Sequence, residues 1–199
     1  MRKAANIGEG DDVLVEVKDG VILMKVFKPR VVDVEPELIE KLLEEEVKLE
    51  EGEKFVLDTG VLVEYIVERA PYRPIVKKLL DEASSGRVRL YATPITLSET
   101  LYVASRIYEK AELSNPNEEA LNYISWIKGR VKVTKIDEHV AIKSGELKKE
   151  LRLALPDCYV LATAESMNAV PLFRKLEKKM ERVFDRLRKM KTKFLGEAF

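Results

Sequence analysis

The 199-residue sequence has very few of the residues that support thiol, imidazole or zinc chemistry. It contains a single cysteine, Cys158, and a single histidine, His139. One cysteine forms no intramolecular disulfide, which indicates a reducing compartment and hence a cytoplasmic protein. One cysteine and one histidine also fall short of the usual zinc ligand set. Nothing around these two residues indicates a Cys–His catalytic pair, so we expect chemistry of another kind.

Long apolar runs and glutamine are missing as well. No stretch approaches the roughly 18 to 20 apolar residues that span a bilayer. The basic residues at the N-terminus are not followed by the apolar run of a secretory signal. We therefore expect no membrane segment. Charged residues make up 35% of the chain while Gln is absent, a combination that is typical of thermophile proteins.

Acidic and basic residues are equal in number, 35 of each, but they are separated along the chain. Between Asp33 and Glu53 there are ten acids and two lysines, and between Arg174 and Lys193 there are ten bases and three acids. One interpretation is two solvated helical faces that pair with each other or with nothing. The other is a basic tail that binds phosphate backbones and an acidic segment that competes for it.

The first 53 residues differ in pattern from the rest. Residues 10–28 alternate apolar and polar side chains on both sides of Asp19-Gly20, a pair that favours a two-residue turn, and they predict a β-hairpin. Residues 36–50 place apolar side chains at helical spacing on a Glu-rich segment, which predicts an acidic helix. We place a domain boundary near residue 53.

From residue 54 onward, predicted strands alternate with predicted helices. The strands are expected at 55–58, 88–94, 131–136 and 169–173, and the helices at 60–70, 74–84, 96–113, 115–126, 138–152 and 157–168, before a long basic helix at 178–199. Such alternation is typical of βα units and a mostly parallel sheet, so the predicted fold class is α/β. Sheets of this kind bind ligands beyond the carboxyl ends of their strands.

Three acids stand where such sites form. Asp58 ends the first strand, Glu99 lies in the first turn of its helix, and Asp157 starts another helix. Each also has a structural interpretation, Asp58 and Asp157 as helix caps and Glu99 as the partner of Thr96 in a capping box. Carboxylates that converged at one sheet edge would repel unless a hard cation such as Mg²⁺ or Mn²⁺ neutralised them. Such a cation activates water for attack on a phosphodiester without Ser, Cys or His.

The sequence around these acids resembles the PIN domain family of VapC-type toxin ribonucleases. The resemblance lies in FVLDTGVLVEY (55–65), TPITLSETLYVA (93–104) and LPDCYVLATA (155–164), and it extends over about residues 54–177. It implies a Rossmann-like three-layer fold that hydrolyses RNA phosphodiesters with Mg²⁺ or Mn²⁺. Asp58, Glu99 and Asp157 would be the metal ligands and catalytic residues, with Thr59 and Thr163 beside them.

Two positions depart from the family pattern. Gly60 stands where the family usually has Asn or Ser. After the last predicted strand, where the family often has a fourth acid, the sequence reads Phe173-Arg174-Lys175. Glu177 is the candidate replacement, and the alternative is a surface glutamate beside Lys178. Three acids allow one metal ion, whereas a two-metal mechanism would need the fourth.

Residues 7–28 resemble the later half of an AbrB-type hairpin domain, a family that usually dimerises, binds operator DNA and serves as the antitoxin of PIN toxins. The two resemblances imply a toxin-like nuclease of a toxin–antitoxin system with a partial antitoxin at its N-terminus. Its partners would be RNA, a cognate antitoxin or its own N-terminal segment, and a second copy in a homodimer. The expected division is 1–53, 54–177 and 178–199. The alternatives are a weak or inactive PIN module that binds RNA or protein, and a DNA-binding regulator acting through the hairpin.

Overall fold

The computed structural model describes residues 13–18, 21–26 and 52–196. The predicted acidic helix at 36–50 and the Asp19-Gly20 turn lie outside the described residues. Within them, none of the helices is long and apolar enough to cross a membrane.

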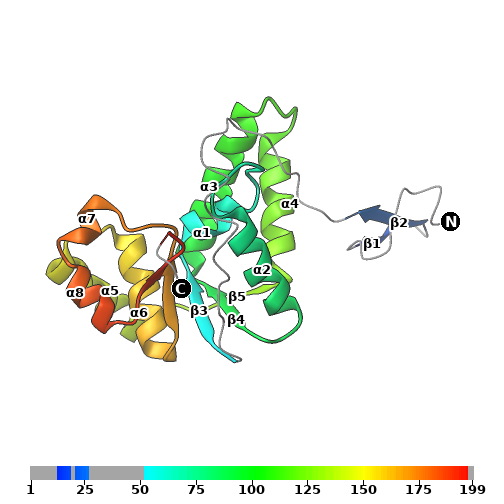
Figure 1. The fold of residues 1–199 in the computed structure, drawn as a ribbon. Helices are drawn as coiled ribbons and strands as arrows, with labels where there is room; N and C mark the ends of the chain where they lie inside the picture. The colour runs from blue at the N-terminus through cyan, green and yellow to red at the C-terminus, as the bar shows by residue number, and fades with distance from the viewer. Residues whose placement is uncertain (1–12, 19–20, 27–51, 197–199) are drawn as a thin grey trace.

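A five-stranded sheet forms the centre of the main domain (Figure 1), and all of its neighbouring strands run parallel. The strand order is β5 (Val131–Val133), β4 (Arg89–Ala92), β3 (Lys54–Leu57), β6 (Val170–Phe173) and β7 (Lys193–Phe194). From β3 the chain adds β4 and β5 on one side, and then returns to add β6 on the other. The direction of winding therefore reverses between β3 and β6, which is where open α/β sheets form their binding crevices.

Helices cover both faces of the sheet and give the three layers that the sequence predicts. One group is α1 (Thr59–Glu64), α2 (Arg73–Ser84), α3 (Pro94–Lys110) and α4 (Pro116–Lys128). The other is α5 (Glu138–Leu151), α6 (Leu155–Met167), α7 (Lys178–Glu181) and α8 (Phe184–Lys189). Figure 1 shows the two groups on opposite sides of the strands.

The central strand β3 explains why two separate cores form. Phe55 and Leu57 are fully buried in the core with α1–α4, whereas Val56 is fully buried in the core with α5–α8. This alternation follows from the two-residue period of a strand. A continuous apolar run is what a parallel strand needs when both of its faces are covered. The predicted α/β class and parallel sheet are thus confirmed.

The predicted long basic helix at 178–199 is wrong. This stretch forms two short helices, α7 and α8, followed by β7, which pairs with β6 as a fifth strand. Met180, Leu187 and Phe194 are all buried in the core with α5–α8. These three residues are spaced seven apart, which is also the spacing of one face of a helix. Their periodicity therefore did not reveal that the helix breaks and that the chain joins the sheet.

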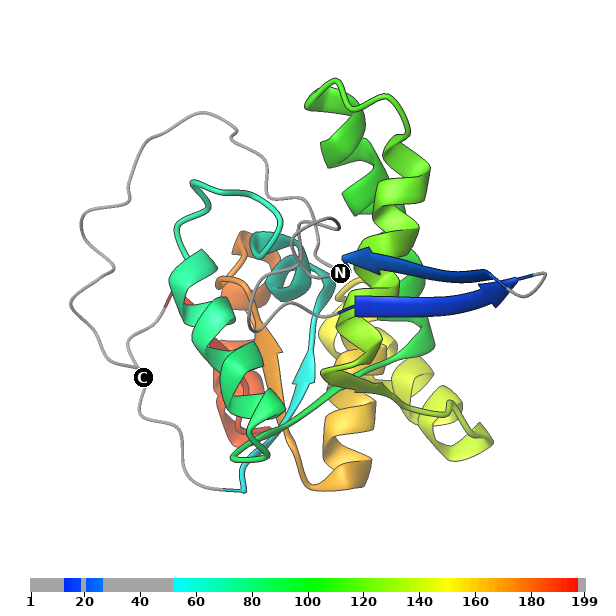
Figure 2. The same ribbon diagram turned by 90° about the vertical axis from the view of Figure 1, so that its right-hand side faces the viewer.

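The predicted β-hairpin is confirmed. Strands β1 (Val13–Lys18) and β2 (Val21–Val26) pair antiparallel, with Lys18 opposite Val21, and form a sheet of their own (Figure 2). Val15, Val21 and Ile22 are exposed by more than half.

The packing of the α5–α8 core can be tested with a matched pair of leucines. Leu161 in α6 is 0% exposed, and Leu121 in α4 is 47% exposed. We expect Leu161→Ala to lower the free energy of unfolding by about 2–5 kcal/mol because it leaves a cavity. Leu121→Ala should change it by only about 0.5 kcal/mol. Urea unfolding measures both, and equal losses would contradict the assigned core.

Candidate active site

Asp58 follows β3 directly, at the point where the winding of the sheet reverses. It is the N-cap of α1, and its Oδ2 accepts a hydrogen bond of 3.0 Å from the backbone N–H of Gly60. The predicted capping role is therefore confirmed. The cap also fixes the carboxylate at the carboxyl end of the sheet, because α1 begins there and a shift of α1 would break the hydrogen bond between Gly60 and Asp58.

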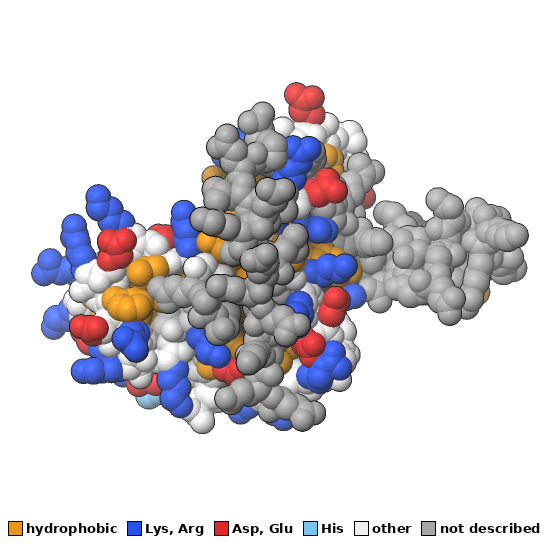
Figure 3. All heavy atoms as spheres, viewed as in Figure 1, with side chains coloured by type: hydrophobic (Ala, Val, Ile, Leu, Met, Phe, Trp, Pro, Cys, Tyr) orange, Lys and Arg blue, Asp and Glu red, His pale blue; other side chains and the backbone are white. Residues whose placement is uncertain are grey.

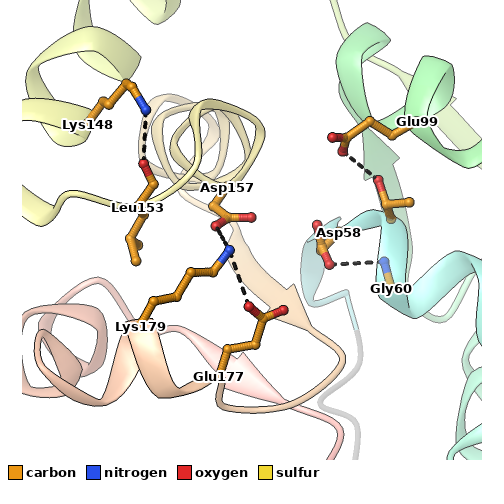
Figure 4. Close-up of polar contacts among 9 residues, drawn as sticks. Asp58, Gly60, Glu99, Lys148, Leu153, Asp157, Glu177 and Lys179 are labelled. Carbon is orange, nitrogen blue, oxygen red and sulfur yellow. Dashed lines mark hydrogen bonds and ion pairs between the residues drawn. The ribbon is translucent and has the colours of Figure 1, made fainter.

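The other two predicted acids lie within electrostatic reach of Asp58. Burial raises the pKa of Asp58 to about 6. The N–H of Gly60 opposes this rise, and the negative charges of Asp157 and Glu99 add to it. Figure 4 shows the three side chains approaching from three different elements: the β3–α1 junction, α3 and α6.

Glu99 does not form the predicted capping box. Helix α3 begins at Pro94, and Thr93 caps it by accepting a hydrogen bond of 3.0 Å from the N–H of Thr96. Glu99 is therefore a turn further into the helix than predicted, and its carboxylate is not used by the cap. Instead, its Oε2 accepts a hydrogen bond of 3.0 Å from the hydroxyl of Thr59. Thr59, the residue after Asp58, thus orients the Glu99 carboxylate toward the start of α1.

Asp157 is buried in the first turn of α6, whose N-cap is Ala154 rather than Asp157. Its Oδ2 accepts a hydrogen bond of 2.8 Å from the ammonium of Lys179, which also lies 3.2 Å from Oε2 of Glu177 (Figure 4). Burial works against the charged form of Lys179. The hydrogen bonds and charges of Asp157 and Glu177 outweigh it and raise the pKa of Lys179. No feature of the sequence indicated this lysine.

The three acids approach one another without forming a closed set of metal ligands. Across the described residues, no three Asp, Glu, His or Cys side chains are close enough to enclose a metal ion. The hydroxyl of Thr163 is buried in α6 and has no hydrogen-bond partner among the residues that the structure describes. Burial raises the pKa of the Cys158 thiol to about 11, while His139 is exposed, which argues against a Cys–His pair.

One of the two departures from the family pattern, Gly60, lies against Arg174, the residue before Lys175. Arg174, directly after β6, forms an ion pair with Glu64, which is buried and also accepts a hydrogen bond of 3.1 Å from the N–H of Tyr72. A Cβ atom on Gly60 would lie 3.0 Å from Cβ of Arg174 and 3.1 Å from Oδ2 of Asp58. A side chain at position 60 would therefore require Arg174 or Asp58 to shift by a few tenths of an ångström.

The fold and these acids define an α/β domain with a candidate cation site at the reversal point of a parallel sheet. The sequence matches the PIN domain family over residues 55–184, and the chain belongs to this family. No curated protein matches the sequence.

Three solved structures show how far the similarity extends. VapBC-1 from nontypeable Haemophilus influenzae is 19% identical with a TM-score of 0.50, over 72% of this chain and 99% of that chain. VapBC2 from Rickettsia felis, in complex with a DNA fragment from the promoter, is 18% identical with a TM-score of 0.49. The match covers 65% of this chain and 92% of that chain. A toxin–antitoxin complex from Klebsiella pneumoniae is 21% identical with a TM-score of 0.45, and the match covers 63% of this chain and 88% of that chain. VapBC-1 supports the fold assignment.

The crowding at Gly60 gives a test with a second helical glycine as its control. Gly60→Ala places a methyl group against Arg174 and Asp58, so we expect a loss of about 1–3 kcal/mol in the free energy of unfolding. Gly145 lies in α5 with open space around it, and Gly145→Ala should stabilise by about 0.5–1 kcal/mol through helix propensity. Thermal or urea unfolding compares the two. Stabilisation by both variants would contradict the close approach of Arg174 and Asp58 to Gly60.

The raised pKa of Asp58 predicts a pH-dependent effect of Asp58→Asn on stability. Between pH 3.8 and about 6 the folded protein holds a proton on Asp58 that the unfolded chain has lost, so the ionised group destabilises the fold above this window. Asn keeps the helix cap without the charge. In the presence of a chelator, Asp58→Asn should therefore be more stable than wild type by roughly 1–3 kcal/mol at pH 7.5. At pH 4 the difference should be close to zero.

Urea unfolding at the two pH values measures this difference, and the pH 4 value serves as the internal reference. The same difference at both pH values would show that the charge of Asp58 is not its source.

Proposed function

We propose that the chain is an endoribonuclease that depends on Mg²⁺ or Mn²⁺ and uses Asp58, Glu99 and Asp157 as its catalytic residues. The observation that carries this proposal is the partly buried Asp58 carboxylate, whose pKa is raised to about 6 beside two further acids at the reversal point of the sheet. The ionised form of such a carboxylate lowers the stability of the fold. Perturbed carboxylates of this kind are concentrated at functional sites.

The donor set fits a hard divalent cation. Asp58, Glu99 and Asp157 offer only carboxylate oxygens, which Mg²⁺ and Mn²⁺ prefer and which zinc sites rarely use alone. These three residues would hold the ion, and Glu177 shares the ammonium group of Lys179 with Asp157. When bound, such an ion activates water and offsets negative charge on the phosphoryl group.

The side chains around the acids have positioning roles in this proposal. The N–H of Gly60 holds Asp58, and the hydroxyl of Thr59 holds Glu99 toward it. Basic side chains gather over α7 and α8, on the left of Figure 3. These helices follow β6 and carry Lys179 to the site, so a phosphate backbone that binds this basic surface would lie next to the acids.

We further propose a toxin-like role, with an antitoxin as the protein partner. The fold shared with VapBC-1 supports this role. The family match begins at residue 55, close to the expected boundary near 53. Gly52 and Glu53 are already joined to the main domain by backbone hydrogen bonds with Arg87 and Arg89. We therefore propose that the segment before them is separate from the nuclease domain and either takes the place of an antitoxin or pairs two copies in a homodimer. The exposed apolar residues of the hairpin support pairing.

A second candidate is a PIN module with weak or no catalytic activity that binds RNA or a protein. Two observations favour it. No three acids of the described chain lie at ligating distance from a common point, and Asp157 is already paired with Lys179. Both candidates predict RNA binding, so cleavage and its dependence on a metal ion distinguish them.

Cleavage of a labelled RNA should require the acids and a divalent ion. We expect activity to be lost in EDTA and restored by Mn²⁺. Asp58→Asn and Glu99→Gln should each lower the rate by at least about a hundredfold, because an amide is a poor ligand for a hard cation. The exposed Glu118→Gln in α4 is the matched control and should cleave like wild type. Cleavage that persists in Asp58→Asn would remove the proposed site. A wild-type protein that binds RNA without cleaving it would favour the second candidate.

A further inference from the structure

The negative charges of the three acids are stabilised in different ways on the two sides of the site. On one side, the hydrogen bonds to Asp58 and Glu99 come from neutral donors, the N–H of Gly60 and the hydroxyl of Thr59. On the other side, Asp157 receives a full positive charge from Lys179 at 2.8 Å. The site of the described chain thus already holds one cation, and this cation is an ammonium group.

The ammonium bridges two carboxylates, as a metal ion would. The Nζ atom of Lys179 lies 2.8 Å from Asp157 and 3.2 Å from Glu177, and Figure 4 shows it between them. The 2.8 Å contact has the length of a charge-assisted hydrogen bond, and the 3.2 Å contact is a longer ion pair. The three donors of one ammonium group can serve both acids. A divalent ion shared by Asp157 and Glu177 would have to displace Lys179 against this attraction.

The fold determines where this lysine stands. It lies in α7, and the next residue, Met180, is 1% exposed in the core with α5–α8. Glu177 is the N-cap residue of the same helix. The segment after β6 therefore delivers an acid and a base together, at the place where the family often supplies an acid alone. This pairing gives Glu177 a partner other than a metal ion.

We propose that the ammonium of Lys179 takes the second cation position of this site, so that the protein binds one divalent ion and Glu177 holds Lys179 instead of a metal. The proposal rests on the proposed function, because it needs a metal site at Asp58, Glu99 and Asp157. Lys179 is a positioning residue for Asp157 and limits the number of ions. A divalent ion near Asp58 and Glu99 leaves the ammonium in place, whereas a second ion does not.

Mn²⁺ binding to the full-length chain tests the proposal without an activity assay. Isothermal titration calorimetry gives the affinity and the number of ions, and electron paramagnetic resonance detects two neighbouring Mn²⁺ ions through their spin coupling. We expect the wild type to bind one ion. Lys179→Gln should bind a second ion or bind the first at least tenfold more tightly. The neighbouring Lys178→Gln, on the same helix and exposed, is the matched control and should titrate like wild type.

A second variant tests the role of Glu177 directly. If Glu177 holds Lys179, Glu177→Gln should change the Kd for Mn²⁺ by less than threefold. If Glu177 is a ligand, the Kd should rise at least tenfold, which would overturn the proposal. Identical titrations of wild type and Lys179→Gln, or two ions bound by wild type, would overturn it as well.

Asp58→Asn distinguishes failure of the proposed metal site from failure of the proposed role of Lys179. Unaltered Mn²⁺ binding by Asp58→Asn means that the proposed function fails, whereas lost binding together with an unresponsive Lys179→Gln means that only the role of Lys179 fails.

Discussion

A partly buried carboxylate beside two others is an unfavourable arrangement, and hydrogen bonds around Asp58 lower its free-energy cost. Burial and like charge both disfavour the ionised form, which is why the pKa of this residue is raised. The helix cap on α1 and the hydroxyl of Thr59 supply hydrogen bonds to the acids. These contacts lessen the repulsion without removing it, and the remaining negative charge makes the site attractive to a cation.

The two sides of the site differ in what accompanies the acids. Near β3 and α3 the partners are neutral and fixed by the start of α1. Near α6 and α7 the partner is charged, because the segment after β6 brings Lys179 to Asp157. The same segment places Arg174 against Gly60 and in an ion pair with Glu64. The connection after β6 thus supplies the charged partners of both Asp157 and Glu64.

Several elements could be predicted because their signals are local. The apolar run 55–57 indicates a strand covered on both faces, and β3 is such a strand. The alternation on both sides of Asp19-Gly20 indicates the hairpin. Other predictions failed because a second local pattern competed. Thr96 and Glu99 fit a capping box, but Thr93 and Pro94 start the helix one turn earlier. The basic residues of 178–199 suggested a helix, but Met180, Leu187 and Phe194 turn the chain back onto the core.

The sequence by itself determined the alternation of strands and helices, the place of Asp58 at a strand end and of Asp157 at a helix start, and the likeness to the PIN family. Only the tertiary structure decided that the chain reverses its winding between β3 and β6, so that these acids share one end of the sheet. It also decided the partner of each charged group. Thr59 and Glu99 are 40 residues apart, Asp157 and Lys179 are 22 apart, and Glu64 and Arg174 are 110 apart. Periodicity and capping patterns describe neighbours within a few residues, whereas contacts over these separations depend on how the strands are ordered.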